Sequence, residues 1–135
     1  MSRPQTAVPG WLVVIVGLGI ALTALGAVVA ITDPALLLGP GEQVTGATRV
    51  YAGYLFSRNL ALAAALTAAL AIGARRQVVG LVTLAGLIQA LDVAVDAATG
   101  RWILVPGLTV LTVLFFLAAR RLAGQPLWRP GTWRD

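Results

Sequence analysis

Cysteine, histidine and lysine are all absent from the 135-residue chain. Without cysteine no disulfide can form, and without cysteine and histidine the usual ligand sets for zinc, iron–sulfur clusters and haem are missing. We therefore expect no cofactor and no metal site. Cysteine usage indicates nothing about the redox compartment.

Charged residues are also scarce. They make up 11% of the chain, where a soluble domain carries about a quarter, while 59% of the residues are hydrophobic. One small domain cannot bury so much apolar surface within itself, so we expect that surface to face lipid. The net charge is +5, but the arginines stand between apolar segments and form no patch interleaved with aromatic residues. This pattern argues against nucleic-acid binding.

Apolar runs of membrane-spanning length occur four times in the sequence. A helix rises 1.5 Å per residue, so about 20 residues cross a hydrocarbon core of about 30 Å. We predict an all-α, integral membrane four-helix bundle with up-down-up-down topology, a single transmembrane domain over residues 1–135. The predicted helices cover about 11–31, 50–74, 77–99 and 104–122, and a tail follows at 123–135.

The first span has a second interpretation as a secretory signal peptide cleaved near residues 28–30. Its apolar run is longer than the usual signal core of about 7–15 residues, so we favour a retained helix. Small residues repeated every four positions predict seams of close helix contact. Two such seams are expected, one of Gly19, Thr23 and Ala27 and one of Gly86, Ala90 and Ala94.

The placement of arginine predicts the orientation in the membrane. With four crossings, seven arginines share one side and two share the other. Positive residues favour the cytoplasmic side, so we expect a multi-pass protein of the cell membrane with both termini in the cytoplasm. The seven are Arg3, Arg75, Arg76, Arg120, Arg121, Arg129 and Arg134, and the two are Arg49 and Arg101.

The third span carries polar residues that should not face lipid. Gln89, Asp92 and Asp96 fall on one face at about 100° per residue. A carboxylate in hydrocarbon costs at least a few kcal/mol, so it usually faces a bundle interior or a watery cavity and has a partner. The candidate partner is Arg58 in the second span, with Asn59 beside it.

Arg58 and Asp92 are expected to meet at equal depth. Spans two and three form a hairpin through Arg75-Arg76 and are therefore predicted to be adjacent. Each of the two residues lies about eight residues, or about 12 Å, from the outer end of its span. This predicts a polar pocket in the outer half of the bundle, below Tyr51 and Tyr54.

The predicted pocket has the residue types for acid/base chemistry on a lipophilic substrate. Two acids with unequal access to an arginine can divide the work of acid and base, and the arginine stabilises developing negative charge. The set resembles limonene epoxide hydrolases in chemistry, without their motif spacing. We expect an isoprenoid, sterol or polyketide to be bound, with isomerisation, cyclisation or epoxide opening as the candidate reactions. The candidate catalytic residues are Asp92, Asp96 and Arg58, and the substrate-binding residues are Asn59, Gln89, Tyr51 and Tyr54.

A structural role is the alternative for the same residues. One Arg58–Asp92 ion pair is sufficient to set the register of the hairpin, and a non-catalytic subunit of a larger membrane complex, or a homo-oligomer, needs only the bundle. A small multidrug transporter is disfavoured because such proteins carry a membrane-embedded acid in the first span, and this first span has none.

Several of these residues carry a family resemblance. From Gly53-Tyr54 to Arg58-Asn59, through Arg75-Arg76, to Asp92 and Asp96, the chain resembles the DoxX-like group of small four-helix membrane proteins. The resemblance covers most of residues 49–122 and implies a four-helix bundle with an arginine in the second helix. Some relatives are linked to quinone-dependent redox complexes. No residue here corresponds to a redox-metal ligand, so that role does not carry over.

Overall fold

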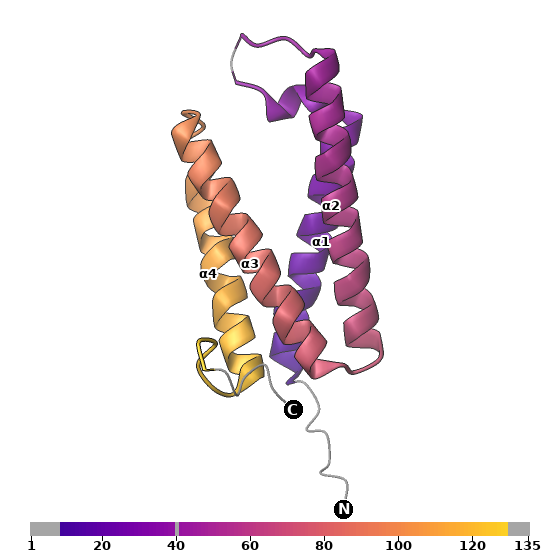
Figure 1. Cartoon of the computed structure of the whole chain (residues 1–135), viewed down its shortest axis with the longest axis vertical. Coiled ribbons are helices and arrows are strands. Elements are labelled where there is room, and N and C mark those ends of the chain that lie inside the picture. Colours follow the sequence, from indigo (N-terminus) through magenta and orange to yellow (C-terminus); the bar gives the residue numbers. More distant parts are fainter. Residues whose placement is uncertain (1–8, 40, 130–135) are drawn as a thin grey trace, which may run out of the picture.

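The computed structural model describes residues 9–39 and 41–129, and this part of the chain is built from four long helices (Figure 1). They are α1 (Gly10–Thr32), α2 (Gly46–Ala71), α3 (Arg75–Ala98) and α4 (Val105–Ala123), with a short 3-10 helix, η1 (Pro34–Leu37), after α1. The predicted all-α, four-helix fold is confirmed. Arg3 and Arg134, which count toward the predicted orientation, lie outside the described residues.

Each of the four helices is long and apolar enough to cross a membrane. Only 22–28% of each span is buried inside the molecule, so most of its apolar side chains face outward. Leu18, Leu91 and Val110 are examples, each more than half exposed. The chain is therefore a small multi-pass membrane protein, whose outward surface suits lipid.

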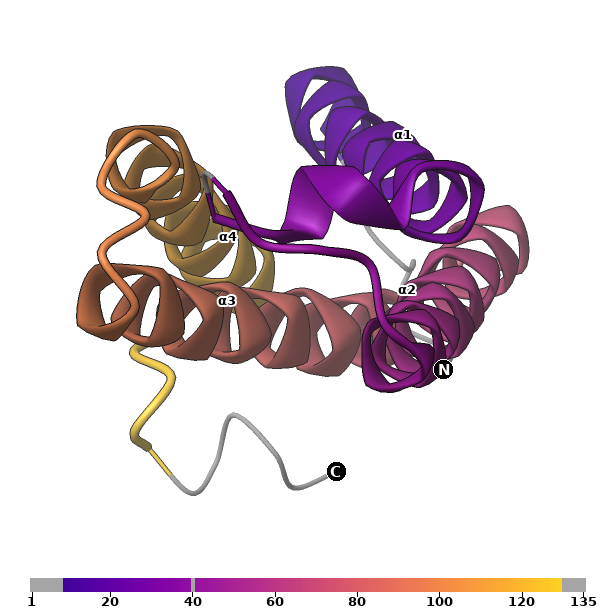
Figure 2. The same cartoon turned by 90° about the horizontal axis from the view of Figure 1, so that it is seen from above.

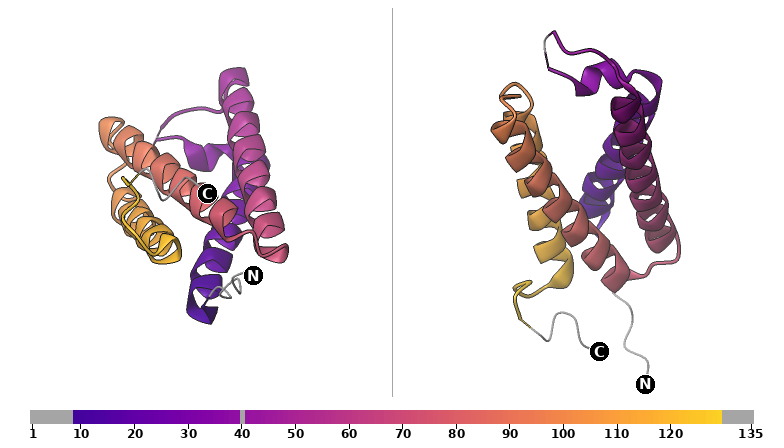
Figure 3. Two further views of the ribbon diagram at one scale, coloured as in Figure 1. Left: turned by 60° about the horizontal axis from the view of Figure 1, so that its bottom comes forward. Right: turned by 45° about the horizontal axis from the view of Figure 1, so that its top comes forward.

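The bundle consists of two tightly packed helix pairs. α1 packs along α2 and α3 packs along α4, whereas α2 and α3 approach each other at the turn that joins them and then separate (Figures 1 and 3). We call the end with this 72–74 turn the turn end and the opposite end the connection end. The predicted adjacency of α2 and α3 therefore holds near their turn, and farther along each helix packs mainly on its other neighbour.

The apolar core lies toward the turn end. A guanidinium–carbonyl hydrogen bond of 2.8 Å, from Arg75 Nε to Leu122 O, ties the start of α3 to the end of α4 there. The buried residues near the connection end are small or polar, such as Ala30, Ala52 and Asp96. The largest fully buried side chains are Phe115, Leu12, Leu66, Leu122, Val16, Val78 and Val82.

A 13-residue connection covers the opposite end of the molecule. It runs from the end of α1 through η1 to the start of α2, and Figure 2 shows it crossing the connection end between the two helix pairs. Thr45 and Thr48 cap α2 reciprocally, each side chain bonding the other's backbone N–H. This capping box starts α2 at Gly46, earlier than the predicted position 50. Gly73, with φ 67°, ends it early by turning the chain.

The two predicted seams of small residues differ in outcome. Gly19, Thr23 and Ala27 are all buried, which confirms the first seam. In the second seam only Gly86 is buried, and Ala94 is exposed. Gly86 lies against α4, where a Cβ built on it would be 3.3 Å from Phe115 Cβ. In the second seam, close helix contact is therefore found at Gly86.

Candidate functional site

Arg58 and Asp92 form an ion pair between α2 and α3. Arg58 Nη2 donates to Asp92 Oδ2 at 3.1 Å. The side chains keep 38% and 31% of their surface exposed, so the pair is not sealed inside the protein. The pair lies between the apolar core and the connection end, where the two helix pairs separate. The expected meeting of these two side chains is confirmed.

Their backbones do not lie at equal depth. Asp92 stands about four residues, or about 6 Å, farther from the 72–74 turn than Arg58. The early start of α2 also leaves Arg58 about 18 Å from its connection end, near the middle of the helix, instead of the expected 12 Å. The long arginine side chain bridges this offset, because its polar head can extend along the helix away from its own Cα.

Asn59 lies next to the guanidinium and against α1. Its Oδ1 accepts a 3.4 Å hydrogen bond from Arg58 Nε. A Cβ built on Gly26 of α1 would be 3.6 Å from Asn59 Nδ2, so a glycine faces the amide. Asn59 and Asp92 thus accept hydrogen bonds from two of the three guanidinium nitrogens of Arg58. Within the described part of the chain, Arg58 Nη1 has no hydrogen-bond partner.

Gln89 lies on α3 one helical turn before Asp92. Its Oε1 is buried and accepts no hydrogen bond from any described residue. Buried polar atoms in native proteins nearly always have a partner, so an orphaned one requires an explanation. Gln89 therefore offers an acceptor, and Arg58 Nη1 a donor, that the described residues do not use.

Asp96 belongs to a different ion pair from Asp92. It is buried, and its Oδ1 lies 3.4 Å from Arg101 Nη1. The backbone N–H of Arg101 also donates to Asp96 O at 2.8 Å, across the turn at Gly100, whose φ is 79°. Sequence reasoning missed this partner. The sequence did contain a signal for it, the spacing of five residues between Asp96 and Arg101 across the turn at Gly100.

Tyr51 and Tyr54 are exposed, at 54% and 74%. They lie on α2 between Arg58 and the connection end, as expected. Among the described residues, no hydrogen bond joins either phenol to Arg58, Asn59 or Asp92. The structure thus brings Arg58, Asn59 and Asp92 into direct contact and leaves both tyrosines facing outward.

Loss of the Asp96 carboxylate is expected to loosen the connection between α3 and α4. Asp96→Asn should lower the free energy of unfolding by about 1–3 kcal/mol, because a buried charge-assisted contact to Arg101 is lost. Amide hydrogen exchange should accelerate in residues 96–104 and stay unchanged around Arg58. Equal acceleration in both regions would show that the two ion pairs form one unit. Arg101→Gln is the matched partner variant.

The fold and these contacts together define the class: a small four-helix membrane protein in which an exposed ion pair joins two helix pairs. Comparison with protein-family models, curated proteins and solved structures finds no match. The resemblance to the DoxX-like group therefore stays a prediction.

Proposed function

We propose that the protein binds a lipophilic small molecule whose polar group contacts the Arg58–Asp92 ion pair. The observation that carries this proposal is the position of the pair. The pair is about one-third exposed, with Arg58 near the middle of α2 and Asp92 about 9 Å from the connection end of α3, where the helix pairs have separated and the apolar core has ended. The exposed part of each side chain is therefore accessible to a ligand in the surrounding lipid.

The unused hydrogen-bonding groups beside the pair define what it can hold. Arg58 Nη1 can donate to a carbonyl, carboxylate or hydroxyl oxygen. Gln89 Oε1 is buried, so it would accept from a hydroxyl group only after its side chain turns outward. The rest of such a ligand would lie against apolar helix surface and lipid. An isoprenoid, sterol or polyketide with one oxygen-bearing end has this combination.

Conversion of the ligand is a further part of the proposal. Asp92 would exchange a proton with it, in an isomerisation, a cyclisation or an epoxide opening, while Arg58 stabilises negative charge. Asp96, held by Arg101, would act as a second acid only after leaving its own partner. We therefore expect Asp92 to carry most of any acid/base activity.

The second candidate function is that of a structural subunit of a larger membrane complex or a homo-oligomer. It is favoured by the same contact, since Arg58–Asp92 joins two helices that otherwise separate.

We also propose that the protein lies in the cell membrane with both termini cytoplasmic. The basic residues Arg75, Arg76, Arg120 and Arg121 at the turn end support this orientation.

A binding experiment separates these candidates. The purified full chain in detergent is titrated with farnesol, with cholesterol, and with farnesane, the hydrocarbon that lacks the hydroxyl group. We expect farnesol or cholesterol to bind, farnesane to bind at least tenfold more weakly, and Arg58→Met to lose at least tenfold in affinity. Arg101→Met, which removes the arginine of the Asp96 ion pair, should keep the affinity.

The stability of the variants completes the test. If neither oxygen-bearing compound binds more tightly than farnesane, while Arg58→Met still lowers the free energy of unfolding, the binding proposal is wrong and the structural role stands. Circular dichroism of each variant checks that it has folded before the titration.

A further inference from the structure

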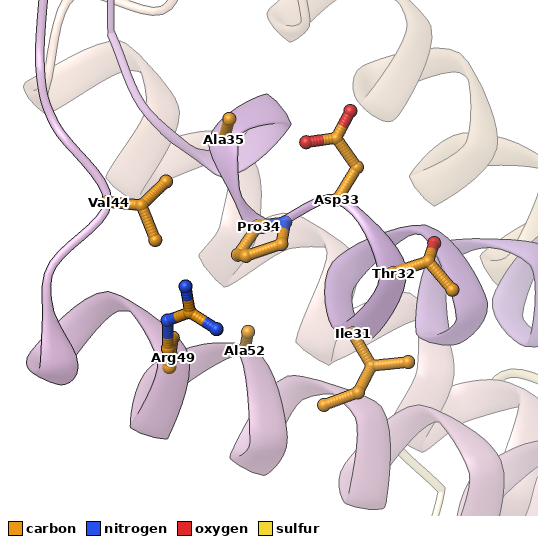
Figure 4. Close-up of a pocket in the computed structure, with 8 residues that line it drawn as sticks. All are labelled: Ile31, Thr32, Asp33, Pro34, Ala35, Val44, Arg49 and Ala52. Carbon is orange, nitrogen blue, oxygen red and sulfur yellow. The ribbon is translucent and has the colours of Figure 1, made fainter.

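A second site lies at the connection end, away from the Arg58–Asp92 pair. A cavity of about 350 Å³ opens between the end of α1, η1 and the start of α2. Figure 4 shows the guanidinium of Arg49 pointing toward Pro34, among the apolar side chains of Ile31, Val44 and Ala52. This volume falls within the range of about 300–1,000 Å³ that small-molecule pockets occupy.

The charge of Arg49 is not compensated by the residues around it. Its side chain makes no hydrogen bond or ion pair with the described residues 9–39 and 41–129. Asp33 also lines the cavity, but its carboxylate is turned away from the guanidinium (Figure 4). Arg58 and Arg101, by contrast, each have a carboxylate partner. Arg49 is therefore available to an anion from outside the chain.

The surroundings indicate an anion that carries an apolar tail. Arg49 stands in the first turn of α2, at the level where a membrane-spanning segment meets the headgroups, and exposed Tyr51 nearby is typical of that level. On α1, toward the membrane centre from Ile31, Val28 and Leu25 are 51% and 58% exposed. A headgroup at Arg49 would thus have apolar helix surface beneath it for its acyl chains.

The geometry points to a binding site for the phosphodiester group of a membrane phospholipid, held by the Arg49 guanidinium in the cavity between α1, η1 and α2. The planar fork of a guanidinium matches two phosphate oxygens, and such charge-assisted hydrogen bonds are about twice as strong as neutral ones. The acyl chains descend along α1 past Val28 and Leu25. This site is independent of the function proposed for Arg58.

Native mass spectrometry of the full chain tests the site. The probes are palmitoyl-oleoyl phosphatidylglycerol and palmitoyl-oleoyl glycerol, which has the same chains without phosphate. We expect Arg49→Gln to retain about tenfold less phospholipid than the unaltered chain. Arg129→Gln removes the same charge at the opposite end of the molecule, after α4. This variant should retain as much phospholipid as the unaltered chain. The glycerolipid should be retained weakly by all three.

Three results of the retention measurement would each overturn the proposal. They are equal phospholipid retention by Arg49→Gln and the unaltered chain, an equal loss with Arg129→Gln, and retention of the glycerolipid as strong as that of the phospholipid. A soluble ligand is distinguished with inorganic phosphate alone, which should not raise the unfolding temperature. Stabilisation by phosphate equal to that by phospholipid would mean that the site takes the free ion. If Arg49→Gln does not fold, Arg49→Lys replaces it, with an expected loss of about threefold, and no loss overturns the lipid site.

Discussion

Replacing Asp92 with asparagine is expected to lower the free energy of unfolding by about 2–3 kcal/mol. The neutral amide would leave the Arg58 guanidinium without a counter-ion near the middle of an apolar span, and an arginine cannot lose its proton to become neutral. The measurement is reversible unfolding in mixed micelles, titrated with dodecyl sulfate and followed by circular dichroism.

Arg58→Met, which removes the other partner of the ion pair, should lower the free energy of unfolding by less than Asp92→Asn does. In Arg58→Met the unpaired group is the Asp92 carboxyl, which can take up a proton and so avoid the cost of an isolated charge. The double variant Arg58→Met/Asp92→Asn should recover most of the loss, because no charge then lacks a partner. Additive losses in the double variant would contradict an energetic coupling between the two side chains. A larger loss for Arg58→Met than for Asp92→Asn would contradict the argument that the carboxyl group can become neutral.

The ion pair illustrates how much of the site the sequence could predict. The cost of a charge in hydrocarbon demands a partner for Asp92, and Arg58 is the one basic residue inside the preceding span. That argument depends on residue types alone and is confirmed by the 3.1 Å contact. The depth argument depends on helix ends, and it failed by about 6 Å because the Thr45–Thr48 cap starts α2 early.

The separation of the bundle into two pairs could not be predicted from hydropathy. Apolar residues occur on every side of all four spans, so the hydropathy pattern does not identify the face on which each helix packs. The choice of neighbour depends on shape, such as the ring of Phe115 against Gly19 and the ring of Phe116 against Gly86. The partner of Asp96 was missed for a related reason. Arg101 was counted only as a residue outside the membrane, although the turn at Gly100 brings it back to α3.

Gly19 is the second position where a large effect is expected. Phe115 of α4 is buried to 2% exposure, and its ring lies where a Cβ on Gly19 of α1 would be built. Gly19→Ala should therefore lower the free energy of unfolding by about 1–3 kcal/mol, since a buried ring within the core has little room to move. The same dodecyl sulfate titration measures the change.

The chain supplies a matched control on the same helix. A Cβ on Gly17 would meet nothing within 4 Å, so Gly17→Ala should leave stability unchanged or raise it by up to about 1 kcal/mol through helix propensity. In Gly19→Ala/Phe115→Leu the smaller side chain makes room for the methyl group, and the double variant should lose less than the two single losses combined. Equal effects of alanine at positions 17 and 19 would mean that α1 and α4 do not approach each other through Phe115.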